Sequence, residues 1–208
     1  MFAAVVLDRD LFERYIGTIP PLAVVIAAAV VGGASMRVLT ARGWVRTGGA
    51  TPAAAVRAFV LGMSMALPAI AFDSAIHFPE DLNVAWPQSL LFYPAVAFVA
   101  EVAFHITPLA VLVAALGWRF DGDDGDRRRI AISIAVVALV ETAFHTLDAL
   151  GGDDRRLAAF VAPQLVAVGV AQLVLFRRHG LTALVGFRLG YYLVWHVVWG
   201  HLRLDLLF

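Results

Sequence analysis

Six long apolar runs dominate the chain and constrain what it can fold into. They cover residues 19–39, 53–72, 88–117, 130–150, 157–176 and 181–202. A helix of about 20 mainly apolar residues crosses the hydrocarbon core of a bilayer. Backbone polar groups find no water there, so each run must satisfy its hydrogen bonds internally. The sequence therefore predicts an all-α, polytopic membrane protein with about six transmembrane helices in a single domain over residues 1–208.

Composition and charge agree with this class and exclude others. Hydrophobic residues make up 61% of the chain, whereas soluble domains contain about 45–50%. The formal net charge is zero, so nothing points to nucleic acid as a partner. The chain has no cysteine, which excludes disulfides, thiolate metal sites and thiol nucleophiles.

The flanking charges predict an orientation. All basic residues are Arg, and eleven of them, Arg188 included, flank the first, third and fifth connections. The positive-inside rule then places these connections in the cytoplasm and both termini outside. Residues 1–16 are expected to form a short interfacial helix, because charges at 8–10 come too early for a signal peptide. An Arg-only basic set is typical of GC-rich or halophilic lineages, and we expect the cell membrane of a prokaryote.

Three local expectations concern the ends and breaks of the spans. Pro108 is predicted to kink the long third segment or to end its regular part. Asp73 and His77 lie near a membrane exit and are expected to be hydrated. Four aromatic side chains of the last span are expected to form an aromatic belt at the membrane interface. These are Tyr191, Tyr192, Trp195 and Trp199.

One polar signature occurs twice inside these apolar runs. It reads Glu-Val-Ala-Phe-His from Glu101 to His105 and Glu-Thr-Ala-Phe-His from Glu141 to His145. Residues four apart share one face of a helix. Ionisable groups are costly in hydrocarbon and normally face a bundle interior or a wet cavity. The repeated motif therefore predicts either one intramembrane site or a buried clamp between helices, and we favour the site.

A further histidine extends this set. His196 lies inside the last apolar run and is the third histidine expected at the site, whereas His201 is expected at the interface. Carboxylate and imidazole groups suit zinc or iron, so the same Glu/His set is the candidate for any metal. The spacing matches neither the His-Glu-x-x-His of zincins nor the Glu-x-x-His of di-iron bundles.

These residues resemble the motifs of the CPBP intramembrane proteases, which include CAAX-type prenyl endopeptidases and abortive-infection-like proteins. The family motifs are Glu-Glu-x-x-x-Arg, Phe-x-x-x-His and His-x-x-x-Asn on three helices. The resemblance covers roughly residues 90–202, and Glu101, His145 and His196 are the positions that match. Four positions carry other residues than the family motifs, and they are Ala100, His105, Glu141 and Gly200.

The resemblance implies a glutamate-type intramembrane endopeptidase that needs no cofactor. Glu101, or Glu141 in its place, would activate water, while His145 and His196 orient that water or stabilise the oxyanion. The implied partners are the lipid bilayer and a membrane-associated peptide substrate. Two alternatives remain: a non-catalytic protein that uses the Glu/His cluster for helix locking or partner binding, and a metal- or proton-handling protein, with zinc as the candidate metal.

Overall fold

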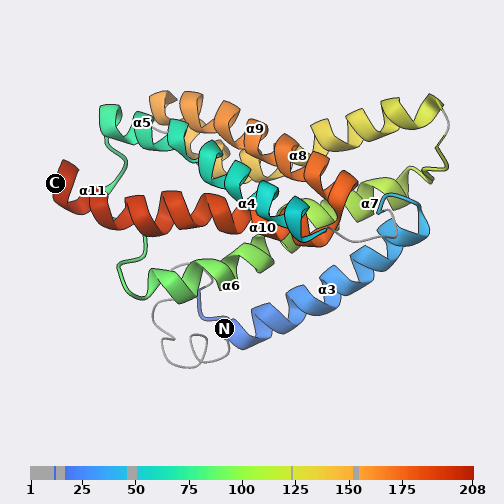
Figure 1. Cartoon of the computed structure of the whole chain (residues 1–208), viewed down its shortest axis with the longest axis horizontal. Coiled ribbons are helices and arrows are strands. Elements are labelled where there is room, and N and C mark those ends of the chain that lie inside the picture. Colours follow the sequence, from blue (N-terminus) through green and yellow to red (C-terminus); the bar gives the residue numbers. More distant parts are fainter. Residues whose placement is uncertain (1–11, 13–16, 46–50, 123, 152–154) are drawn as a thin grey trace.

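The structure is a computed structural model that describes residues 12, 17–45, 51–122, 124–151 and 155–208. Over these residues the regular secondary structure is helical throughout (Figure 1). In chain order the elements are α3 (Pro21–Ala41), α4 (Pro52–Met65), α5 (Leu67–Ile76), η1 (Glu80–Leu82), α6 (Ser89–Glu101), η2 (Val102–Ile106), α7 (Thr107–Ala115), α8 (Asp124–Gly151), α9 (Arg155–His179), α10 (Leu181–Tyr192), η3 (Leu193–Trp199) and α11 (Gly200–Leu207). Here η1 is a 3₁₀ turn, while η2 and η3 are π-helical turns.

These elements join into six helices that are long and apolar enough to cross a membrane, counted over the described residues. They are Pro21–Ala41, Pro52–Ile76, Ser89–Ala115, Asp126–Leu147, Ala158–His179 and Leu181–Leu207. The prediction of a polytopic helical membrane protein is confirmed. The expected interfacial helix at 1–16 lies outside the described residues except for Phe12, whose ring centroid packs 5.0 Å from that of Phe92.

The last span lies at the centre of the bundle. In Figure 1 the continuous red helix α10–η3–α11 runs between the pair α4–α5 and the helix α6. α10 packs against α4, α6 and α9, while α8 pairs with α9, and α3 packs on α7 and η2 at the periphery. Because α10 touches three other helices, a side chain that it carries can reach groups on several spans.

The packing of α4 against α10 depends on two glycines. A Cβ at Gly62 would collide with the carbonyl oxygen of Phe187, and a Cβ at Gly190 would collide with that of Phe59. Small residues let helix backbones approach closely in a membrane, where burial of apolar surface drives association weakly. The two glycines therefore set the distance between α4 and the central helix.

Gly62→Ala and Gly190→Ala should each lower the free energy of unfolding by about 1–3 kcal/mol, because the backbones must separate to admit the methyl group. The measurement is SDS-induced unfolding in mixed micelles, followed by tryptophan fluorescence. Gly33→Ala is the matched control, since a Cβ there meets nothing within 4 Å. Equal stability of the Gly190→Ala and Gly33→Ala variants would contradict this account of the packing.

The two π-helical turns lie in spans that carry candidate site residues. η2 contains His105 and η3 contains His196. Pro108 follows η2 and has no N–H to donate to the carbonyl four residues earlier. The helix accommodates Pro108 after this wider turn and continues to Ala115, so the third apolar run forms one candidate span. Such π turns are rare and are often found at functional sites.

A buried ion pair fixes the connection between α5 and α6. Asp73 and Arg203 are both fully buried, and the Arg203 Nε lies 2.6 Å from the Asp73 Oδ2. Arg203 also donates to the carbonyl oxygens of Phe78 (2.6 Å) and Pro79 (2.9 Å). The prediction that Asp73 is hydrated was wrong, because Arg203 from the last span compensates its charge; His77 is exposed, as predicted.

Candidate functional site

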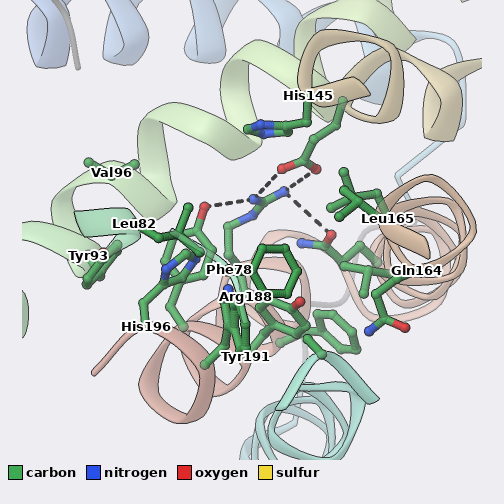
Figure 2. A pocket seen from close by; sticks show the side chains of 18 of the residues that line it. Phe78, Leu82, Tyr93, Val96, His145, Gln164, Leu165, Arg188, Tyr191 and His196 are labelled. Atoms are coloured by element: carbon green, nitrogen blue, oxygen red, sulfur yellow. Dashed lines mark hydrogen bonds and ion pairs between the residues drawn. The ribbon is translucent and has the colours of Figure 1, made fainter. Parts of the chain in front are cut away.

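Arg188, on α10, is the centre of a buried polar cluster. Its side chain is 4% exposed, and it donates hydrogen bonds to side chains from three other spans. Figure 2 shows Arg188 among the side chains that line the neighbouring cavity. Its N–H groups point to Glu101, Glu141, Gln172 and Tyr192. Every guanidinium nitrogen therefore has an acceptor, as a buried cation requires.

Glu141, on α8, receives a two-point contact from this guanidinium. The Arg188 Nη1 and Nη2 lie 2.8 Å from the two carboxylate oxygens of Glu141. Such bidentate pairs fix the plane of the carboxylate as well as its position. Each carboxylate oxygen has a second lone-pair site, so Glu141 can still accept a hydrogen bond from water.

Glu101, at the end of α6, is enclosed on every side. It is fully buried, and its Oε1 accepts from the Arg188 Nε at 2.5 Å and from the Gln172 Nε2. Its Oε2 lies 3.0 Å from the His105 Nδ1. Glu101 does not line the neighbouring cavity. Its position therefore suits the fixing of Arg188 better than contact with a substrate.

His105 lies between the two carboxylates. Its Nδ1 is next to Glu101, and its Nε2 lies 3.8 Å from the Glu141 Oε2. The ring is fully buried. The structure thus brings together Glu101, His105 and Glu141, three of the five site residues predicted from sequence.

The charges of the cluster leave room for one proton. Two carboxylates and one guanidinium carry one excess negative charge, and one proton on His105 or on a carboxylate makes the cluster neutral. Neutrality matters here because an uncompensated charge is expensive in a membrane interior. Neutralising one carboxylate by mutation should consequently be tolerated better than removing the arginine.

A cavity of about 400 Å³ lies beside the cluster, on the side of Glu141. Among its lining side chains are Glu141, His145, Arg188, Tyr192 and His196. The remaining walls are mainly apolar and come from α5, the α5–α6 connection, α6, α9, α10 and η3; they include Phe78, Leu82, Phe92, Val96, Phe160, Val161, Leu165, Val168, Phe187, Tyr191 and Trp195. Volume and lining are typical of a small-molecule or substrate site.

The predicted aromatic belt is wrong for two of its members. Tyr191 and Trp195 are 8% and 6% exposed and line the cavity. Trp199 donates to the Asp73 Oδ2 at 2.6 Å. The polar atoms of these aromatic side chains lie against a buried partner or the cavity inside the bundle, so these side chains do not depend on the membrane interface for hydrogen bonds.

His145 and His196 face the cavity, but neither bonds to the arginine cluster. His145 is exposed, and within the described part of the chain its close neighbours are the rings of Phe104 and Phe144. The His196 Nδ1 donates to the Asn83 Oδ1 at 2.7 Å. With the proton on Nδ1, neutral His196 presents its Nε2 as a hydrogen-bond acceptor. The His196 ring stacks on Tyr93 at 4.4 Å between centroids.

Sequence reasoning missed the residue at the centre of the site. Arg188 was assigned to the fifth connection as a topological charge, whereas it is buried within α10. Gln172 and Asn83 were also missed. An arginine and a glutamine well inside apolar runs are unusual enough to have been noticed, since polar groups at such depths need partners.

The chain matches no protein-family model, no curated protein and no solved structure. Among the described residues, no group of three or more His, Asp or Glu side chains is arranged to hold a metal ion. Arg188 contacts one oxygen of Glu101 and both oxygens of Glu141. Zinc binding therefore stays a prediction.

Proposed function

We propose that the chain is an intramembrane hydrolase of the glutamate type that cleaves a membrane-embedded peptide in the cavity beside Arg188. The observation that carries this proposal is the placement of Glu141. This carboxylate lines a mainly apolar cavity and is held in a fixed orientation by a bidentate arginine contact. The resemblance to the CPBP proteases supports the same class of chemistry, with the carboxylate supplied by Glu141 in place of Glu101.

In this mechanism Glu141 accepts a proton from a water molecule in the cavity. The hydroxide oxygen adds to the carbon of the peptide carbonyl, and the developing negative charge falls on the carbonyl oxygen. His196 orients the water by accepting its second hydrogen at Nε2. The Tyr192 hydroxyl, which accepts from Arg188 at 3.0 Å, keeps its own hydrogen to donate to the oxyanion. The C–N bond then breaks, and the proton is passed to the amine that leaves.

The other members of the cluster act through Arg188. Glu101 and Gln172 hold the guanidinium from α6 and α9, and His105 lies between the carboxylates. They are positioning residues on this proposal. His145, at the edge of the cavity and close to Glu141 in sequence, supplies a second imidazole that can exchange protons with the site.

Glu141→Gln should lower the rate of cleavage by about 10²–10⁴-fold, the usual range for loss of a general base. Proteoliposomes that contain the protein and a library of membrane-spanning peptides are analysed for cleavage products by mass spectrometry. Glu80→Gln, at an exposed position, is the matched control. Cleavage by a Glu101→Gln, Glu141→Gln double variant at the wild-type rate would overturn the proposal.

A second candidate function is a non-catalytic helix lock. It is favoured by one observation: side chains from three other spans, together with Tyr192 of the same helix, supply an acceptor to every nitrogen of the Arg188 guanidinium. A lock predicts that Glu141→Gln changes the unfolding free energy while no peptide is cleaved by either protein. Zinc and iron analysis of the same purified preparation separates a metal-handling protein from both. The prokaryotic cell membrane is the location that we propose for either function.

A further inference from the structure

The cavity offers no partner for a negatively charged ligand. Glu141 and Arg188 are the charged side chains in its described lining, and they bond to each other. Arg188 also forms an ion pair with Glu101. The two carboxylates together carry more negative charge than the single guanidinium can balance. Burial of a further charge without a counter-ion is costly. An anionic occupant would add to this excess of negative charge, so we expect an occupant that carries no negative charge.

The polar groups at the edge of the cavity select a hydroxyl. The His196 Nδ1 is engaged with Asn83, which leaves Nε2 as an acceptor that needs an O–H or N–H donor. The Tyr192 hydroxyl remains able to donate. Away from this edge the wall is mainly apolar, with Phe160, Val161 and Leu165 contributed by α9. This combination fits a molecule with a hydroxylated head and a hydrocarbon chain.

The surroundings of His145 indicate where such a molecule comes from. His145 is exposed although it lines the cavity, so it marks an opening. The neighbouring Phe144 is 66% exposed, and its ring centroid lies 5.1 Å from that of Phe104 in η2. In a protein that spans a membrane, large exposed apolar groups on a spanning helix face lipid. The opening beside α8 is thus continuous with the bilayer.

We propose that this cavity binds an uncharged single-chain lipid with a hydroxylated head, such as a monoacylglycerol, that enters from the bilayer. The head lies at His196 and Tyr192, and the chain lies among the side chains of α9 and η3. The proposal depends on the cavity and its paired charges alone, and it holds whether or not the site hydrolyses a peptide.

Trp195 provides a probe, because it lies in the cavity wall and bromine quenches indole fluorescence on contact. The protein in phosphatidylcholine nanodiscs is titrated with a brominated monoacylglycerol and, separately, with a brominated fatty acid of equal chain length. We expect saturable quenching by the neutral lipid and binding of the carboxylate at least about tenfold weaker. Trp195→Phe should remove the saturable part, while exposed Trp86 gives a non-saturating background.

Variants that fill the cavity complete the test. Val161→Phe and Val96→Phe should each lower the affinity for the neutral lipid at least about tenfold. Val136→Phe, at a lipid-facing position on α8, should leave this affinity unchanged. Non-saturable quenching, equal affinity for the fatty acid, or full affinity in both filled variants would overturn the proposal. The wild-type comparison of the two lipids decides the matter even if a filled variant does not fold. No cleavage is measured, so this result is independent of the proposed hydrolase activity.

Discussion

Arg188→Met is expected to lower the free energy of unfolding by about 3–5 kcal/mol, the loss typical of breaking a buried ion pair by removing one partner. Glu101 and Glu141 would then face each other through His105 without a guanidinium between them. Lysine should not rescue the protein, because one ammonium cannot bond to both carboxylates in the planar geometry that Arg188 uses. SDS-induced unfolding in mixed micelles measures the effect.

A rescue variant separates charge from packing in this prediction. The triple variant Arg188→Met, Glu101→Gln, Glu141→Gln carries no buried charge in the cluster and should recover most of the lost stability. Arg178→Met, at an exposed position, is the matched control and should resemble the wild type. If Arg188→Met were as stable as Arg178→Met, the ion pairs of the cluster would contribute little to the stability of the fold.

The six spans were predictable because apolar length decides membrane insertion before tertiary packing is considered. The shared face of Glu101 and His105 was predictable for a similarly local reason, since residues four apart on a helix are neighbours. Glu141 and His145 have the same spacing as Glu101 and His105, but only the first of the two is buried in the cluster. Glu141 is buried against Arg188, whereas His145 is exposed at the edge of the cavity.

The cation of the cluster could not be placed from local patterns. Arg188 and Glu101 are 87 residues apart in the chain, and Arg203 and Asp73 are 130 apart. Counting arginines for topology treats each as a hydrated charge, so Arg188 was assigned to a membrane flank although it is buried. Charge balance offered a clue: carboxylates at 101 and 141 needed a buried cation, and Arg188 lies well inside the last apolar run. The other arginines still lie in excess at the first, third and fifth connections, so the predicted orientation is unchanged.

The connection between α5 and α6 shapes the cavity, whereas the Arg188 cluster supplies its charged groups. It contributes Phe78 and Leu82 to the cavity wall, and its Asn83 holds His196. Its position depends on Asp73, whose Oδ1 accepts from the backbone N–H of Phe78 at 2.6 Å. The buried Asp73–Arg203 pair thus links the folding of the last span to the shape of the cavity.

Asp73→Asn should lower the free energy of unfolding by about 3–5 kcal/mol, because it leaves the Arg203 guanidinium buried without a counter-charge. Asn also turns an N–H₂ group toward donors that the carboxylate had accepted from, namely Trp199 and Arg203. The control is Asp205→Asn, which changes an exposed residue of the same type on α11. SDS unfolding gives the free energy.

Limited proteolysis of the α5–α6 connection gives a second readout for the same change. Loss of the bonds from Arg203 to the carbonyl oxygens of Phe78 and Pro79 should make this segment cleavable in Asp73→Asn at protease concentrations that leave Asp205→Asn intact. The double variant Asp73→Asn, Arg203→Met removes both charges, so it should be more stable than the sum of the single changes predicts. Strict additivity would mean that the two side chains do not act as a pair.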